Sequence, residues 1–246
     1  GFADGFRGLN QNVKTYFDQE HIDDGPGSLL KTSYDYVDID RAVKNLGDYD
    51  RLYCICGNES MKSARDLALD DRVDTNIIGI AKTIFNDMPG LESIGFQTAV
   101  QELARYIDSA YIEASSTNSI VFLEVPGRHN SRLTTHAGLA RNSKITNVIT
   151  PSTRGDYRTS IEYSYGNRGY AVVIISEMCE YDYLITSLSV KAKVITPGYL
   201  IGAVDPCTYD SILAERMVRE AFNHAQEHRD FIKGATNIMP FKDYLR

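Results

Sequence analysis

Short, nearly continuous apolar runs rich in β-branched residues recur along this chain. They occupy residues 51–56, 75–81, 118–125, 145–150 and 170–176. Hydrophobicity that is continuous rather than alternating is typical of strands covered on both faces. Segments with helical periodicity separate these runs, and the repetition of strand, helix and strand predicts parallel sheets with helices on both sides. The expected fold class is therefore α/β.

Two segments show the periodicity of amphipathic helices. Residues 97–115 carry apolar side chains at spacings of three and four, and residues 208–225 do the same after Thr208, the predicted N-cap. The stripe positions are Val100, Leu103, Ala104, Ile107, Ala110, Tyr111 and Ala114 in the first, and Ile212, Leu213, Met217 and Phe222 in the second.

Composition excludes several classes of protein. With 246 residues, 43% of them hydrophobic, the chain can bury the core of one large domain or two small ones. A formal charge of -7 and the lack of any run of Lys or Arg argue against nucleic acid or anionic membrane as the main partner. No apolar stretch approaches about 18 residues, so no transmembrane segment is predicted. The first residue is Gly1 rather than Met, which is consistent with a missing N-terminal segment.

The cysteines are few and unpatterned. Cys54, Cys56, Cys179 and Cys207 match neither a four-ligand metal site nor a local disulfide. We expect reduced thiols in a cytosol-like, cytoplasmic compartment.

Polar residues follow several of the predicted strands. In parallel α/β sheets, ligands lie beyond the carboxyl ends of the strands, so these loops are where chemistry is expected. The four loops are residues 57–60, 82–87 and 126–129, and the position of Glu177.

Sequence motifs at these loops resemble one known family. They are GIAKTIFNDMPG at 79–90, FLEVPGRHNSRLTTHAGLA at 122–140, VIISEM at 173–178 and PGYLIGAVDPCTYDSILAERM at 197–217. In order and approximate spacing they resemble the 6-phosphofructokinase family over nearly the whole chain. The resemblance implies two Rossmann-like αβα sandwich lobes with mainly parallel sheets: a phosphoryl-donor lobe of residues 1–97 plus 200–246, and a sugar-phosphate lobe of residues 98–199. Residues 1–9 resemble the family's second strand and turn, which implies that its first strand and glycine-rich phosphate loop are absent here.

The turn at residues 83–87 departs from the family at its centre. The family transfers a phosphoryl group from ATP or pyrophosphate, with Mg²⁺, to the 1-hydroxyl of fructose 6-phosphate, and its motif here is Thr-Ile-Asp-Asn-Asp. The first Asp of that motif is the catalytic base, and this chain has Phe85 in its place, between Thr83 and Asp87. A phenyl ring accepts no proton, and losing a general base commonly costs about 10²- to 10⁴-fold in rate.

The predicted phosphoryl-donor loop also departs from the family pattern. The family's Gly-Gly-Asp-Gly-Ser turn corresponds to residues 56–60, where Asn58 lacks the carboxylate that Mg²⁺ favours. No confident metal ligand is therefore predicted. An acidic residue at the position of Glu59, together with a Lys at the position of Lys82, resembles the sequence pattern of the family's pyrophosphate-dependent branch. The predicted donor-binding residues are Gly57, Asn58, Glu59, Ser60 and Lys82.

The sugar-phosphate motifs are partly retained. A His and two Arg of the family correspond to Tyr199, Gly202 and Ser119. Lys193 stands where the family has an Arg and cannot make the same bidentate contact. The predicted substrate-binding residues are Thr83, Gly127, Arg128, Glu177, Lys193 and Tyr199, and the predicted catalytic residues are Asp87 and Thr83.

Structural explanations compete with these roles. Phe85 fills a core in one such explanation, and Thr83 and Asp87 are ordinary turn formers in another. The remaining alternatives are an ion pair of Arg128 with Glu124 or Glu177, a loop cap by Glu177, and a solvated Lys82. His224 and His228 also fit an H-x-x-E-H zinc pattern, which we weigh as a minor alternative.

The hypothesis is a catalytically impaired phosphofructokinase-like protein that serves as a regulatory or structural subunit. It would form a homo-oligomer, or a hetero-oligomer with an active paralogue. One rival is an active enzyme with Asp87 or water as the base, which would need Mg²⁺ with ATP or pyrophosphate. Another rival is a non-catalytic sensor of a sugar phosphate or nucleotide, and a purely structural subunit would need no cofactor.

Overall fold

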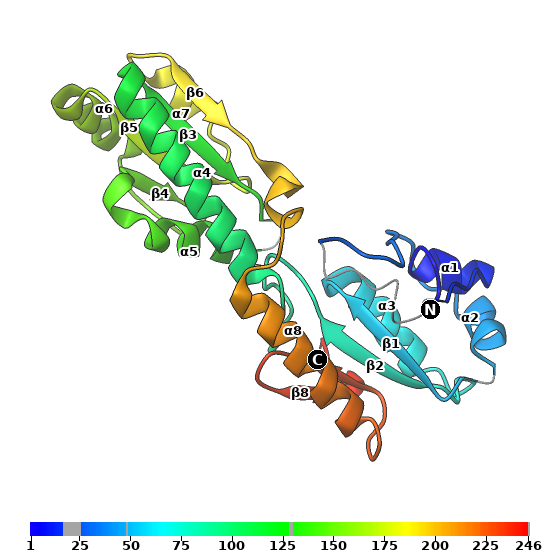
Figure 1. Ribbon diagram of the computed structural model, residues 1–246. Coiled ribbons are helices and arrows are strands. Elements are labelled where there is room, and N and C mark those ends of the chain that lie inside the picture. The colour runs from blue at the N-terminus through cyan, green and yellow to red at the C-terminus, as the bar shows by residue number, and fades with distance from the viewer. Residues whose placement is uncertain (17–25, 48, 128–129, 246) are drawn as a thin grey trace. The chain divides into compact units, whose positions relative to one another are not determined.

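The computed structural model describes residues 1–16, 26–47, 49–127 and 130–245, and it divides into two compact units (Figure 1). Unit 1 is Gly1–Gly95 with Thr208–Arg246, and unit 2 is Phe96–Cys207. Residues 200–207, which the sequence resemblance assigned to the first lobe, lie in unit 2. The reason is that the 3₁₀ helix η3 (Gly198–Gly202) packs against helix α4 (Phe96–Thr117) of that unit.

Unit 1 contains a four-stranded sheet of order β1-β2-β7-β8. Strands β1, β2 and β7 are parallel, and β8 pairs with β7 in the antiparallel direction. The strands are β1 (Arg51–Cys56), β2 (Asn76–Ala81), β7 (Phe231–Lys233) and β8 (Ile238–Pro240). The helices are α1 (Phe6–Gln11), α2 (Ile39–Leu46), α3 (Asn58–Ala68), α8 (Thr208–His224) and the 3₁₀ helix η4 (Phe241–Asp243).

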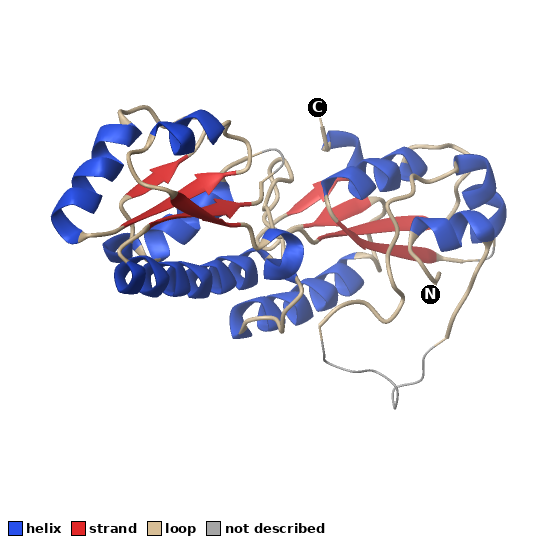
Figure 2. Ribbon diagram, turned by 90° about the horizontal axis from the view of Figure 1, so that it is seen from above, coloured by secondary structure: helices blue, strands red, loops and turns tan. Residues whose placement is uncertain are grey.

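Unit 2 contains a fully parallel sheet of order β4-β5-β3-β6, with helices on both faces (Figure 2). The strands are β3 (Ile120–Val125), β4 (Asn147–Ile149), β5 (Ala171–Ser176) and β6 (Ala192–Ile195). Besides α4, the helices are α5 (Arg132–Ala140), η2 (Asn142–Lys144), α6 (Tyr157–Arg168) and α7 (Asp182–Ser187).

Alternation along β3 builds both halves of the unit 2 core. Ile120 and Phe122 belong to one buried cluster, which includes Ile161 of α6. Val121 belongs to another, which includes Ala110 of α4. Consecutive strand residues point to opposite faces, so a strand covered on both sides must be apolar throughout. This is the physical basis of the continuous apolar runs, and the α/β fold class is confirmed.

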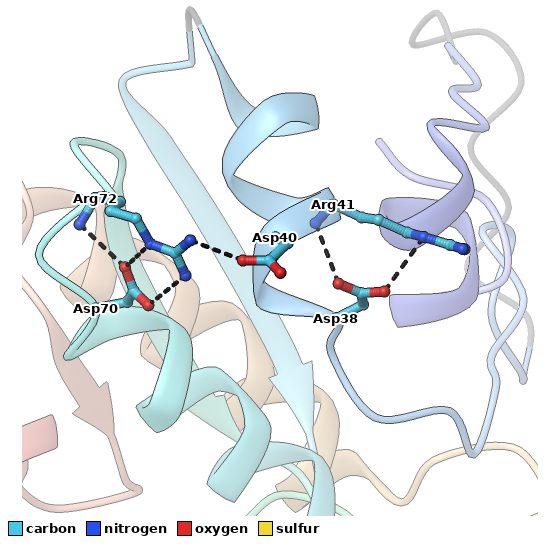
Figure 3. Close-up of polar contacts among 5 residues, drawn as sticks. All are labelled: Asp38, Asp40, Arg41, Asp70 and Arg72. Carbon is cyan, nitrogen blue, oxygen red and sulfur yellow. Dashed lines mark hydrogen bonds and ion pairs between the residues drawn. The ribbon is translucent and has the colours of Figure 1, made fainter.

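A surface network links α2 to the loop that follows α3 (Figure 3). The Arg72 guanidinium donates to Asp40 at 2.7 Å and to both carboxylate oxygens of Asp70 at 2.9 Å, which holds the pKa of Asp70 at about 2. Asp38 caps α2 by accepting the Arg41 N–H at 3.2 Å, and the same carboxylate lies 3.2 Å from the Arg41 Nε. These contacts fix the start of α2 beside the α3–β2 connection.

The structure corrects three expectations. Residues 1–9 were expected to form a strand and turn, but Phe2 makes only an isolated bridge and α1 begins at Phe6. In α8, Ile212 and Phe222 are 64% and 53% exposed, because the side of the helix that faces the core is the one carrying Leu213 and Met217. Thr208 is the first residue of α8 rather than its cap.

Candidate functional site

The loops that follow β1 and β2 lie against each other in unit 1. The Lys82 N–H donates to the Cys56 carbonyl at 3.0 Å. A Cβ on Gly57 would lie 3.4 Å from the Lys82 carbonyl oxygen, so the two backbones approach closely at this glycine. Gly57 is extended and precedes α3, which begins at Asn58. The predicted donor-binding segment and the turn at 83–87 therefore share one edge of the sheet.

Thr83 organises the turn after β2. It is 8% exposed, and its hydroxyl donates to Asp87 Oδ1 at 3.1 Å. The same hydroxyl accepts the Phe85 N–H at 3.1 Å. Thr83 and Asp87 therefore act as turn formers, whatever else they do, and the Phe85 side chain projects from a fixed backbone.

Asn86 and Ser93 complete this turn, and neither was named as a site residue. Asn86 has a positive φ of 48°, and its side-chain oxygen accepts the Ser93 N–H at 3.0 Å. The Ser93 hydroxyl donates to the Thr83 carbonyl at 2.8 Å. The only sequence signal was Asn86 itself, because Asn tolerates the left-handed conformation better than most residues.

Phe85 is half-buried rather than fully enclosed. Its place between Thr83 and Asp87 is the one at which the sequence resemblance expects a carboxylate. A phenyl ring at this position offers no group that accepts or donates a proton. Among the side chains of residues 83–87, Asp87 is the remaining carboxylate, and it is also half-buried.

The start of α3 does not suit a magnesium ion. Mg²⁺ prefers carboxylate and phosphate oxygens in octahedral geometry. Asn58 is neutral, and its amide oxygen accepts the Tyr244 hydroxyl at 2.6 Å. The Glu59 carboxylate is paired with Lys62 at 2.7 Å. Within the part of the chain that the structure describes, no group of three or more His, Cys, Asp or Glu side chains could hold a metal ion.

In unit 2, Glu177 fixes the loop that follows β3. Its carboxylate accepts the Gly127 N–H at 2.8 Å, and its own N–H donates to the Val125 carbonyl at 3.0 Å. A Cβ on Gly127 would lie 2.6 Å from the Asn130 carbonyl oxygen, so this loop is closely packed. Glu177 thus holds a backbone amide, which is the loop-capping alternative. Arg128 lies outside the described residues.

The other predicted substrate residues of unit 2 lie apart from this loop. Lys193 is in β6 opposite Val121, near the start of β3, and its ammonium contacts Glu113 and the Thr117 hydroxyl of α4. Tyr199 is 56% exposed on η3. The structure therefore does not bring Lys193 to the Gly127 loop.

Glu124, an alternative partner for Arg128, accepts a hydrogen bond from the Tyr181 hydroxyl. Burial, followed by this carboxylate, raises the pKa of Tyr181. Ser119, at the position of a family Arg, is 7% exposed and lies 2.8 Å from the Thr117 hydroxyl. Both contacts are structural.

The histidines of the zinc pattern stack on each other. The ring centroids of His224 and His228 are 4.0 Å apart, and His224 also meets the Phe231 ring edge-on at 4.6 Å. Burial, followed by the charge of His228, lowers the pKa of His224. The pair packs as aromatic side chains over the end of the sheet.

Removing the Thr83 hydroxyl should destabilise unit 1. Thr83→Val keeps the shape of the side chain but leaves the Phe85 N–H without its acceptor, which costs about 1–3 kcal/mol. Thr83→Ser keeps the hydroxyl and loses one methyl group, at about 0.8 kcal/mol. Urea unfolding measures both, and a Val variant no less stable than the Ser variant would show that these hydrogen bonds do not hold the turn.

Comparisons with known proteins agree on one family. Residues 1–225 match the family model described as "Phosphofructokinase". The ATP-dependent 6-phosphofructokinase of Hamiltonella defensa is 30% identical over 88% of this chain and 71% of that protein. The enzyme of the same description from Corynebacterium efficiens is 31% identical over 72% of this chain, which spans only 54% of it.

A solved structure shares the fold. A pyrophosphate-dependent phosphofructokinase from Marinobacter aquaeolei superposes with a TM-score of 0.86 at 18% identity, over 100% of this chain and 74% of that one. Of the described helices, none is both long and apolar enough to cross a membrane.

Proposed function

Because the chain belongs to the phosphofructokinase family, we propose that it is a catalytically impaired member that serves as a regulatory or structural subunit of an oligomer. The family reaction is phosphoryl transfer to fructose 6-phosphate. In this proposal the chain keeps the fold and parts of the substrate loops, and an active paralogue or a second copy of the chain is its partner.

The turn after β2 carries the proposal. Phe85 stands between Thr83 and Asp87, which are hydrogen-bonded to each other. Phosphoryl transfer depends on positioning and on a group that orients or deprotonates the attacking hydroxyl. An aromatic ring supplies neither, and it takes up the space of a smaller polar side chain.

The donor side adds a second defect. Asn58, at the start of α3, is neutral and committed to Tyr244. Mg²⁺ with ATP or pyrophosphate would have to bind there without the carboxylate that hard cations favour. Between ATP and pyrophosphate, Glu59 together with Lys82 favours pyrophosphate as the donor.

The purified chain should show no turnover above background in a coupled assay with fructose 6-phosphate, Mg²⁺ and either ATP or pyrophosphate. Phe85→Asp should stay near background as well, although a lost base alone would account for about 10²- to 10⁴-fold. The reason is that Asn58, Tyr199 and Gly202 also depart from the family pattern. Phe85→Leu is the matched control, since it changes the ring without adding a carboxylate.

Two outcomes would contradict this proposal in different ways. Turnover by the unaltered chain would establish an active enzyme, and Asp87→Asn would then test Asp87 as its base. A large gain in Phe85→Asp alone would show that Phe85 is the only serious defect. If turnover is absent, calorimetric titration with fructose 6-phosphate, ATP and pyrophosphate separates a ligand sensor from a structural subunit.

A further inference from the structure

Tyr244, in the segment of residues 241–245 that follows β8, is buried at the start of α3. Tyr244 has 0% exposure and is the largest fully buried side chain among the described residues. Its hydroxyl donates to Asn58 Oδ1 at 2.6 Å, across 186 positions of sequence. A phenol buried with its hydroxyl on a side-chain amide is a specific polar contact and does more than fill space.

This contact lies at the edge of the sheet where a phosphate-bearing ligand is expected. Asn58 follows the carboxyl end of β1 and opens α3, and parallel α/β sheets bind ligands beyond such strand ends. The free N–H groups of a helix N-terminus favour anions there. Burial raises the pKa of Tyr244, and Asp87, Cys56 and Glu59 contribute to the same shift. The hydrogen bond to Asn58 places the phenol at the loop that follows β1.

The segment that carries Tyr244 is anchored by the residues that precede the tyrosine. Upstream, β8 pairs with β7, and the Phe241 N–H donates to the Asp230 carbonyl at 2.9 Å. The Phe241 ring is fully buried, and a Cβ on Gly79 of β2 would lie 3.1 Å from it. The Tyr244 N–H donates to the Phe241 carbonyl at 3.1 Å. These contacts hold the phenol against Asn58 as part of the unit 1 core.

We propose that Tyr244 is an intramolecular occupant of the phosphoryl-donor site, so that a pyrophosphate or nucleotide phosphate and the Tyr244 side chain exclude each other at Asn58. Close-packed interiors leave no room for both. The proposal deepens the proposed function, on which it rests for the location of the donor site. In this proposal, the segment of residues 241–245 is an autoinhibitory element.

Shortening the side chain tests this exclusion. In Tyr244→Leu the phenol is gone but the core keeps an apolar residue, and in Tyr244→Phe the ring stays and only the hydroxyl is lost. Magnesium pyrophosphate and magnesium ATP are titrated calorimetrically into the full chain and both variants. If the open form is at most about 10% populated, Tyr244→Leu should bind pyrophosphate at least about tenfold more tightly than the unaltered chain. Tyr244→Phe should gain much less, because its ring still fills the space.

Tyr181→Leu is the matched control, because it removes a hydrogen-bonded phenol from unit 2 and should not change the affinity for pyrophosphate. Tyr244→Met, whose flexible side chain adapts to gaps, replaces the Leu variant if that variant does not fold. Hydrogen exchange of residues 238–245 in the unaltered chain adds a readout without mutation, since bound pyrophosphate should accelerate it.

The outcomes are decisive for this proposal and distinct from those of the turnover assay. A gain in Tyr244→Leu, or faster exchange on binding, supports the occupant. Equal affinity of the chain and the folded Leu or Met variant overturns it, whether all of them bind or none does. Binding by the unaltered chain without faster exchange also overturns it. Turnover by the unaltered chain would refute the proposed impairment but would leave this comparison of affinities intact.

Discussion

Phe122→Ala should lower the free energy of unfolding of unit 2 by about 3–5 kcal/mol. The Phe122 ring is fully buried at the centre of β3, where β5 and β6 pair on either side of the strand. It stacks on Tyr181 with ring centroids 6.4 Å apart and an interplanar angle of 13°. Its removal leaves a cavity that the two neighbouring strands cannot close, because their backbones are fixed by the sheet.

Urea unfolding followed by far-UV circular dichroism measures this loss. Tyr183→Ala is the control, because Tyr183 is 86% exposed and a surface substitution of this kind changes stability by about 0.5 kcal/mol or less. Equal midpoints for the two variants would mean that the β3 face is not a packed core.

Glu220→Ala should destabilise unit 1 by about 2–4 kcal/mol, whereas Lys233→Met should leave it within about 1 kcal/mol of the unaltered chain. The Lys233 side chain is 3% exposed in β7, and its ammonium lies 2.6 Å from the Glu220 carboxylate of α8. The ammonium is the main cause that lowers the pKa of Glu220. Removing Glu220 leaves a buried charge unpaired, while Met removes that charge and keeps most of the volume.

A second ion pair of α8 provides the control. Arg219 and Glu215 lie 2.7 Å apart with side chains 75% and 66% exposed. Glu215→Ala should cost about 0–1 kcal/mol, because water already solvates both charges. If Glu220→Ala proves as mild as Glu215→Ala, water reaches Lys233 when its partner is gone.

The strands that lie in continuous apolar runs were predictable, whereas β6, β7 and β8 were not. Every strand predicted from an apolar run is present. Strands β2 and β5 are buried throughout, as continuous apolar runs predict, whereas Ile55 of β1 is 55% exposed. Strands β7 and β8 have three residues each, and β7 carries the charged Lys233. Hydrophobic spacing also gave the period of α8 but not its buried side. Which side is buried depends on the sheet against which the helix packs.

The candidate site was predictable only where its residues are close in sequence. The spacing of Thr83, Phe85 and Asp87 was enough to place them in one turn, and the structure joins Thr83 to Asp87. No local pattern connects Asn58 with Tyr244, which lies 186 residues away. Lys193 matched a motif position, yet its strand register directs it to α4.

Unit 1 is built from two segments that are far apart in the sequence, and this affects how it folds during synthesis on the ribosome. Strand β2 pairs with β7, whose first residue is Phe231, whereas all four strands of unit 2 lie between Ile120 and Ile195. Since domains fold as units while the chain emerges, unit 2 can be complete while the β7 edge of β2 is still unpaired. An unpaired apolar strand edge invites association with other chains. The nascent chain therefore passes through a stage in which this edge is open to association with other chains, and the stage ends when β7 has left the exit tunnel and pairs with β2.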